Sequence, residues 1–577
     1  MRTILLLILI IAFTEITAQQ NSKSEIEIAL KKIKDFDSTQ ERKDSVAGHP
    51  LGSLNEEDFL SRYNFYQSIN DKLISIDKST LAFDDLVNLE LLQYTVEEEI
   101  SNYKYKSYLN PIVSDGGFHT YLASFGSRIY TSKKEFEDYI NRLKDMPRFT
   151  NENISLMRKG LELGICQPRA IFDGYQNTYE QHIVTTVEKS IFWKPFLKKP
   201  FAIDDGDWKK LTDSAKIAIM QYAVPGFKTI RKFFDEEYLL KTRRTIGVSN
   251  FPNGLAFYQD RVHHFTTTEL SYEEIYQLGL SEVARIKKEM LDVIKEVKFK
   301  GSLQDFIRFL RTDRRFYCTT PEQLLKEASF IAKKIDGILP QFFGKLPRQP
   351  YNVEAVPAHL APTYTGGRYS GAPITSRSSG HYWVNTYNLP SRPLYTLESL
   401  TLHEAVPGHH LQISLTQELT DLPEFRRNLY VNAFGEGWGL YCEYLGTEMG
   451  FYKDPYSHFG RLTYEMWRAC RLVIDVGLHA KGWTREQAVK YLAENTALSL
   501  HEVNTEINRY IAWPGQALAY KIGELKIKEL RKKAVDKLKD KFDIREFHDL
   551  VLSRGTVTMK ILEMMVDNYV KEKLGEK

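Results

Sequence analysis

Apolar residues recur at three- and four-residue spacing over most of this chain of 577 residues. Side chains at that spacing share one face of a helix, and the many Glu and Lys residues between them suit the face turned to water. Ser271 and Glu274 have the spacing of a capping box, and the pattern after them predicts a helix to about Val297. Similar patterns predict helices over 22–46, 54–80, 133–164, 208–240 and 322–338. We therefore expect a mainly α fold.

The interval 347–395 breaks this pattern. It is rich in Pro, Gly, Ser and Tyr, and it contains one alternating stretch, His381 to Thr386, that is typical of a strand. Helical patterning resumes near Thr396 and continues to the C-terminus. We expect helical support over 19–346 and the chemistry over 347–577, either as two domains or as one integrated fold.

The first 18 residues have the pattern of a secretory signal. Met1 and Arg2 supply a basic start, Leu5 to Phe13 is almost wholly apolar, and Ala18 is a small residue of the kind that signal peptidases accept. The apolar run is shorter than the roughly 20 residues of a spanning helix, and no later run is long and apolar enough. No cysteine lies near Ala18, which argues against a lipid anchor. We expect a cleaved signal peptide over 1–18 and a soluble periplasmic or secreted protein.

The charge and the cysteines exclude two classes of function. The 78 Lys and Arg residues nearly balance 75 Asp and Glu residues, so no field of one sign would attract nucleic acid. The cysteines are far apart and form no Cys-x-x-Cys pair, so a thiolate zinc site is not supported, although one or two disulfides remain open. They are Cys166, Cys318, Cys442 and Cys470.

A group of histidines suggests a metal site of another kind. Zinc peptidases commonly use His-Glu-x-x-His on a helix, because residues four apart share a face and the glutamate between them reaches the metal's water. Here His403 and Glu404 open such a motif, but Pro407 and Gly408 follow, and the next histidines are His409 and His410. In an unbroken helix position 409 points to another side, and position 410 lies roughly 10 Å along the axis from position 403.

Pro407 and Gly408 resolve this problem if the helix breaks between them. Proline lacks the N–H that the turn needs, and glycine tolerates backbone angles that other residues avoid. The break would bring His409 or His410 back toward His403, and we favour His409 because it needs the smaller insertion. The other histidine would then contact substrate or support a ligand.

Glu436 is the expected third ligand. It lies between two glycines, which we interpret as room for the close approach that a short carboxylate ligand needs. Glu443 is seven positions later on the same helical face, so it could orient a ligand from behind. A polar helix end at Pro-Gly is the alternative. It does not explain why the histidines stand in an apolar run, because buried polar groups need partners.

A polar stripe follows at spacings of 3, 4 and 4 in an otherwise apolar helix, formed by Arg468, Arg471, Asp475 and His479. The stripe lines a wet cleft or forms a paired structural network, and the pattern does not choose between these. On the first interpretation an arginine would clamp a substrate carboxylate.

A second Pro-Gly break precedes Gln516 and Tyr520. A broken helix that presents these two residues on adjacent turns could donate a hydrogen bond to a developing oxyanion. For Tyr520 alone, a packed side chain at a helix start is an equal alternative.

These motifs together resemble the bacterial family catalogued as domain of unknown function 885, which is grouped with zincin-like metallopeptidases. The resemblance rests on the His403 to His410 segment with Gln412, on Glu436 to Tyr441, and on Pro514 to Ala517, and it extends over nearly the whole mature chain. It implies a helical fold similar to the M3 (gluzincin) and carboxypeptidase Taq types, with a small β element and a deep cleft for short peptides. The Pro-Gly insertion departs from ordinary zincins.

We expect zinc-dependent hydrolysis of short peptides, with one zinc ion and a carboxypeptidase or dipeptidase preference. Glu404 would take a proton from a metal-activated water and pass it to the leaving amine, with Tyr520 assisting. The strand at 381–386, which includes Asn385, would pair with extended substrate. The alternatives are a zinc-containing peptide-binding protein without activity, which would not need Glu404, and a hydrolase of non-peptide amides or esters.

Overall fold

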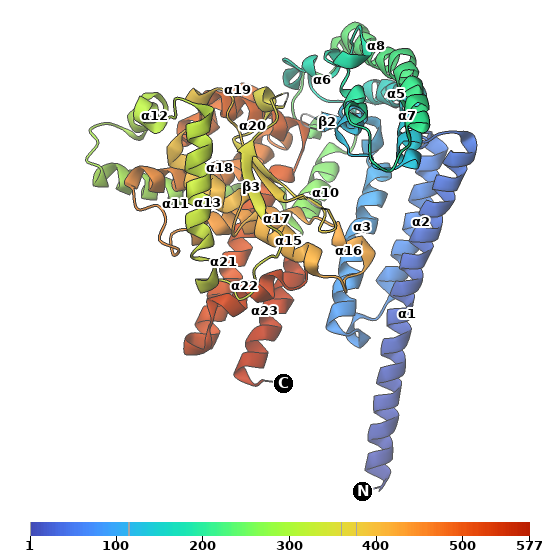
Figure 1. The fold of residues 1–577 in the computed structure, drawn as a ribbon. Helices are drawn as coiled ribbons and strands as arrows, with labels where there is room; N and C mark the ends of the chain where they lie inside the picture. The colour runs from blue at the N-terminus through green and yellow to red at the C-terminus, as the bar shows by residue number, and fades with distance from the viewer. Residues whose placement is uncertain (1, 114–115, 359, 377, 577) are drawn as a thin grey trace. The chain divides into compact units, whose positions relative to one another are not determined.

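The computed structural model describes residues 2–113, 116–358, 360–376 and 378–576, and it describes side chains from Ser22 onward except that of Thr363. The chain forms two compact units (Figure 1). The first contains residues 1–245 and 250–253, and the second contains residues 246–249 and 254–577. Helices make up most of both units and the sheets are small, which confirms the prediction of a mainly α fold.

The first unit consists of helices and one short hairpin. Helices α2 and α3 lie side by side, and α1 contacts both. Residues 2–18, for which we predicted a signal peptide, belong to α1, and their side chains lie outside the described part of the chain, so cleavage stays a prediction. The elements are α1 (Arg2–Ala47), α2 (Glu56–Ser75), α3 (Phe83–Lys104), β1 (Ile112–Val113), β2 (Gly116–Gly117), α4 (Phe118–Ser124), α5 (Lys133–Leu163), α6 (Asn177–Glu180), α7 (Asp205–Ala218), α8 (Val224–Phe233) and α9 (Leu239–Lys241).

The second unit contains all the residues for which we predicted chemistry. Its elements are α10 (Gly254–Thr266), α11 (Tyr272–Glu296), α12 (Leu303–Thr312), α13 (Pro321–Asp336), β3 (Tyr351–Ala355), β4 (Gly367–Ser370), β5 (Gly380–Val384), α14 (Leu397–Glu404), α15 (His409–Glu418), α16 (Glu424–Arg427), α17 (Asn432–Leu445), α18 (Pro455–His479), α19 (Arg485–Asn495), α20 (Leu500–Ala512), α21 (Ala519–Leu538), α22 (Ile544–Leu552) and α23 (Met559–Leu574). Residues 254–346 belong to this unit, so the boundary between the two compact units lies before the change in composition at 347.

Helix α18 lies at the core of the second unit. Every residue from Phe459 to His479 is buried, because α18 is packed against several helices, with its longest contact along α11. A helix that is covered all round must pair its own polar side chains inside the protein. Helices α17 and α21 form a second closely packed pair.

A three-stranded sheet, of which β3 is labelled in Figure 1, contacts the helices α14 and α15 through β4. Its order is β3-β5-β4, with β5 parallel to β3 and antiparallel to β4. The strand predicted at 381–386 is β5, at Gly380–Val384. It is the central strand, so both of its edges are already paired, and the expectation that it pairs with substrate is wrong. The strand with a free edge next to α14 is β4.

Several local predictions agree with the structure. Ser271 caps α11 through the reciprocal capping box with Glu274. The expected helix at 208–240 corresponds to α7, α8 and α9. Two π-helical segments, Ile219–Ala223 and Phe234–Tyr238, join these helices without a break. All four cysteines are free thiols, so the one or two disulfides left open by the sequence are not formed. Among the described residues, no helix is both long and apolar enough to cross a membrane.

Candidate metal centre

The helix that carries His403 breaks where Pro407 and Gly408 stand. Helix α14 ends at Glu404, α15 begins at His409, and the Val406–Pro407 peptide between them is cis. A Cβ atom at Gly408 would lie 1.9 Å from the His403 carbonyl oxygen, so this close chain crossing admits only glycine. The break sets the rings of His403 and His409 edge to face, with centroids 4.7 Å apart.

Glu436, on α17, completes a group of three ligand-type side chains. Its Oε2 lies 3.6 Å from His403 Nε2 and 3.4 Å from His409 Nε2, and one ligand atom from each residue lies within 4.8 Å of the others. His403 is almost wholly buried, but the side chains of His409 and Glu436 are 10% and 14% exposed. The triad is therefore accessible from one side.

The two glycines beside Glu436 do not make room for a metal ligand, contrary to our expectation from the sequence; they let α17 approach Tyr430 and α21 closely. A Cβ at Gly435 would collide with the Tyr430 ring, and a Cβ at Gly437 would lie 2.5 Å from the backbone of Gly523 on α21. The glycine that makes room for a ligand is Gly439, where a Cβ would lie 2.6 Å from the His403 ring. The close approaches are thus between α17 and its neighbours, and Glu436 itself needs none.

Charged groups around the triad favour a cation there. Burial lowers the pKa of His403, but the carboxylates of Glu436, Glu443 and Glu404 outweigh burial and raise this pKa to about 10. Burial raises the pKa of Glu436, but the two histidines hold it well below its usual value. The surroundings therefore stabilise positive charge between these side chains.

Glu443 lies behind His403, on the side away from the triad. Its Oε1 is 2.8 Å from His403 Nδ1 and 3.1 Å from an amino group of Arg468. An acceptor at Nδ1 keeps the proton on that nitrogen, so Nε2, which faces Glu436, is the nitrogen that would give up its proton and offer a lone pair to a cation. Arg468, which we predicted for substrate, is engaged in this support.

Glu404 and His410 both contact Tyr369 of β4, but through different atoms of that residue. Glu404 accepts a hydrogen bond of 2.8 Å from the backbone N–H of Tyr369 on β4, and it lines the same cavity as the triad. His410 points away from the triad, because its Nδ1 is 3.0 Å from the Tyr369 hydroxyl and its ring packs on Tyr351. Burial lowers the pKa of His410 to about 4, so it is neutral near pH 7.

The triad opens into a cavity of about 490 Å³. This volume suits a ligand the size of a short peptide. The other walls come from β4 and from α18, α20 and α21, and they are rich in aromatic rings and arginines. The lining residues outside the triad include Arg368, Tyr369, Glu404, Tyr430, Asn432, Tyr464, Trp467, Arg468, Arg471, Arg509, Trp513, Gln516 and Tyr520.

The second Pro-Gly segment brings Gln516 and Tyr520 to the cavity. Arg509 donates hydrogen bonds to the side-chain oxygens of both residues, at 3.0 and 2.9 Å. The Tyr520 ring is nearly parallel to the ring of His403, with centroids 6.4 Å apart. The Tyr520 oxygen accepts from Arg509, and within the described part of the chain its O–H has no acceptor, so it can donate into the cavity.

The lower half of the polar stripe is structural. Asp475 accepts hydrogen bonds from the Tyr258 hydroxyl, at 2.6 Å, and from the backbone N–H of Gly515, at 3.0 Å. His479 Nε2 is 2.9 Å from the backbone oxygen of Tyr510. Neither residue lines the cavity, but Asp475 holds the turn from which Gln516 projects. The two interpretations of the stripe therefore each apply to half of it.

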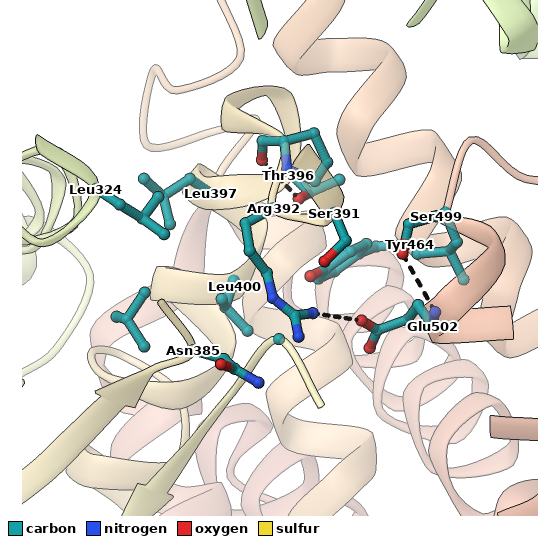
Figure 2. Close-up of a pocket in the computed structure, with 14 residues that line it drawn as sticks. Leu324, Asn385, Ser391, Arg392, Thr396, Leu397, Leu400, Tyr464, Ser499 and Glu502 are labelled. Atoms are coloured by element: carbon teal, nitrogen blue, oxygen red, sulfur yellow. Dashed lines mark hydrogen bonds and ion pairs between the residues drawn. The ribbon is translucent and has the colours of Figure 1, made fainter. Parts of the chain in front are cut away.

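Asn385 lies outside the cavity, in a smaller adjoining pocket of about 30 Å³ (Figure 2). Its amide donates to the backbone oxygens of Ala361, Tyr364 and Thr365, and its side chain is fully buried. It therefore shapes the loop before β4 and has no hydrogen left for a substrate. Figure 2 also shows the buried ion pair of Arg392 and Glu502, 2.9 Å long, at the boundary with the large cavity.

Sequence reasoning missed two groups at the site. Arg509 stands seven residues before Gln516 in the same Pro-Gly segment, and that proximity could have singled it out. The backbone N–H of Tyr369 carries no signal in the sequence, because it reaches Glu404 only through the register of β4 on the sheet.

Comparisons with known proteins agree on the extent of the fold. A family model described as "Bacterial protein of unknown function (DUF885)" matches residues 43–566. The solved structure of a protein described as a "putative lipoprotein" from Colwellia psychrerythraea is 29% identical, with a TM-score of 0.83 over 96% of this chain and 99% of that chain. A "putative lipoprotein of unknown function" from Shewanella oneidensis is 16% identical, with a TM-score of 0.69 over 93% and 98%. No curated protein matches.

Proposed function

Because the chain belongs to the DUF885 family of bacterial proteins of unknown function, we propose its function from the metal centre itself: zinc-dependent hydrolysis of peptide bonds in short peptides. On this proposal the fold is a zincin-like one in the wider sense, with one zinc ion held by His403, His409 and Glu436. The protein acts on exported or extracellular peptides if the predicted signal peptide is cleaved.

The spacing of the three ligand atoms carries the proposal. Tetrahedral zinc with bonds of about 2.0–2.1 Å sets neighbouring ligand atoms about 3.4 Å apart. The separations of 3.4 and 3.6 Å between the carboxylate and the two imidazoles fit this value and exceed those of good direct hydrogen bonds. Two histidines and one glutamate also form the ligand set of a well-known class of catalytic zinc sites, which keep a fourth position open.

Zinc, Glu404 and Tyr520 would each have a separate role in the reaction. Bound zinc would supply a Lewis acid and a water of lowered pKa. Glu404 would accept the proton of that water on its oxygen not held by Tyr369 N–H, and would deliver it to the leaving nitrogen. The Tyr520 hydroxyl would donate to the oxygen of the scissile carbonyl as negative charge develops there.

Extended substrate backbone would bind along β4. This strand is at the edge of the sheet, and Gly367, Arg368 and Tyr369 line the cavity. Peptides commonly add to such an edge through main-chain hydrogen bonds, which give affinity without demanding one particular sequence.

Hydrolysis of a peptide pool tests this proposal. We expect purified protein to cleave short peptides, to lose that activity with a zinc chelator, and to regain it when zinc is restored. Glu404→Gln should lower kcat by at least about 100-fold, the size of a general-base contribution, while it retains zinc. Cleavage that survives both chelation and Glu404→Gln would refute the proposal.

A matched control variant shows whether a loss of activity arises from a general effect of a Glu→Gln substitution on folding. Glu418→Gln changes a glutamate near the end of α15 that pairs with Arg348 outside the cavity, and it should leave activity unchanged. Metal analysis of all three proteins gives a reading that is independent of turnover.

A further inference from the structure

One wall of the cavity carries two arginines that share a single carboxylate. Arg471, on α18, is 2.7 Å from one oxygen of Glu506, and Arg509, on α20, is 3.5 Å from the other. The remaining hydrogen bonds of both guanidinium groups go to neutral partners, namely Tyr510, Gln516 and Tyr520. Within the described residues, neither arginine has a second carboxylate at ion-pair distance.

Burial makes the unbalanced positive charge of these two arginines energetically unfavourable. Arg471 is 1% exposed, and its Nη1 is buried without a hydrogen-bond partner among the described residues. A buried charge is strongly destabilising unless it is paired and hydrogen-bonded. Arg468 differs, because Glu443 balances it. The wall formed by Arg471 and Arg509 therefore lacks one anionic partner.

This wall lies close to the triad. The Tyr520 ring is 6.4 Å from the His403 ring, and the Arg471 guanidinium lies 4.0 Å from the centre of the Tyr520 ring. The guanidinium is thus within about 10 Å of the His403 ring. An extended peptide advances about 3.3–3.6 Å per residue, and a bound carboxylate would lie between the arginines and the triad, so the remaining distance to a carbonyl at the triad would correspond to one or two residues.

We propose that Arg471 and Arg509 bind the C-terminal carboxylate of the substrate, so that the protein removes the last one or two residues of a peptide. This inference rests on the proposed peptidase function and assigns it a substrate class and an end of the chain. In the reaction the scissile C–N bond breaks, the oxygen of water joins the carbonyl carbon, and its two protons end on the new amine and carboxyl groups. A guanidinium pair suits a carboxylate because its N–H donors match the two oxygens.

Three related peptides distinguish a C-terminal carboxylate from a side-chain carboxylate at the same end. The first has a free C-terminal carboxylate, the second is the amide, and the third is the amide with aspartate as its last residue. We expect kcat/KM for the free acid to exceed that for the amide by about 10- to 100-fold, the usual effect of a charge-assisted hydrogen bond. Preference for the aspartate amide over the free acid would overturn the assignment to the terminal carboxylate.

Variants of Arg509 test the assignment directly. Arg509→Gln should lower kcat/KM for the free acid by about 10- to 100-fold more than for the amide, mainly through KM, so that the preference for the free acid is lost; any loss common to both peptides reflects the hydrogen bonds from Arg509 to Gln516 and Tyr520. Arg509→Lys keeps the charge and should restore part of the preference, which a merely structural role would not do. Arg308→Gln, at a 73% exposed side chain on α12, is the matched control. Equal losses for acid and amide in Arg509→Gln would overturn the inference.

Binding to Glu404→Gln gives a reading without turnover. We expect isothermal titration to show at least about tenfold tighter binding of the free acid than of the amide, and to show no such preference in Glu404→Gln with Arg509→Gln. Equal cleavage and equal binding of acid and amide would refute this inference and leave the peptidase proposal intact. Zinc-independent or absent cleavage of every peptide would instead refute the peptidase proposal.

Discussion

His409 and His410 are neighbours on α15 with opposite surroundings. His409 Nε2 faces Glu436 at 3.4 Å, and its Nδ1 is buried without a hydrogen-bond partner among the described residues. His410 instead interacts with the Tyr369 hydroxyl and packs on Tyr351. One position along the chain therefore separates an imidazole that faces Glu436 from one that supports the sheet.

This contrast predicts different effects of two alanine substitutions. His409→Ala removes a proposed ligand, so zinc affinity should fall by more than the roughly 10- to 100-fold that loss of an outer-shell partner costs. His410→Ala should retain zinc and instead weaken the packing of β3 and β4 on α15. Competition with a chromophoric chelator measures both affinities. Equal losses, or the larger loss in His410→Ala, would contradict our assignment.

Single site residues could be predicted where they belong to a recognisable motif. His403, Glu404 and Glu436 stood out because polar residues in an apolar run need a reason, and the structure brings the first and third together with His409. The choice between His409 and His410 depended on the path of the chain through Pro407 and Gly408, which spacing alone does not fix. The glycine that makes room for His403 proved to be Gly439 because such room depends on packing.

At the scale of elements, α17 holds Glu436 in place through its crossing with α21. The crossing is made by Gly437 and Gly523, whose backbones approach so closely that a Cβ at either would collide with the other helix. Such contact fixes the distance of α17 from α21 and leaves little freedom for repacking.

Gly437→Ala should therefore move α17 and affect both stability and metal binding. A Cβ would lie 2.5 Å from the Gly523 backbone, and overpacking of this kind costs about 1–3 kcal/mol. Urea unfolding and zinc affinity should both show a loss. Gly337→Ala, which meets only ordinary contact at 3.6 Å, is the control and should change stability by less than about 0.5 kcal/mol. Unchanged zinc affinity in Gly437→Ala would show that α17 does not control the triad.

The elements themselves were largely predictable, because helical periodicity and caps are local signals. The order β3-β5-β4 was not, since sheet order depends on contacts between segments distant in sequence. For that reason the alternating pattern at 381–386 located a strand correctly but gave no indication that it is central, with β3 and β4 at the edges.

At the scale of the whole molecule, the second unit is built around a helix with ionisable groups inside its core. Most of these groups on α18 have a charged partner: Glu465 pairs with Lys521, Arg468 with Glu443, and Arg471 with Glu506. Asp475 is different, because its hydrogen-bond partners are the neutral groups of Tyr258 and Gly515, and its Oδ2 has no partner among the described residues.

Asp475 should therefore make stability depend on pH. Burial raises its pKa from 3.8 to about 7, against the opposing hydrogen bonds from Tyr258 and Gly515 and the positive charge of Arg471. The folded protein thus binds more protons than the unfolded chain between about pH 4 and pH 7, and its free energy of unfolding should fall as pH rises through that window and then level off. The loss should be about 2–4 kcal/mol, since one pKa unit corresponds to about 1.4 kcal/mol.

Asp475→Asn removes this titration and keeps an oxygen that accepts from Tyr258 and Gly515. The variant should match the wild type near pH 4 and become more stable by about 2–4 kcal/mol at pH 8, where the wild type must bury a charged carboxylate. Urea unfolding at pH 4.5, 6 and 8 measures the difference, and hydrogen exchange of α18 amides assigns it to this unit. Asp292→Asn, at an exposed carboxylate on α11, should leave the curve unchanged. Parallel curves for Asp475→Asn and wild type would mean that Asp475 is already ionised in the folded protein at pH 4.5.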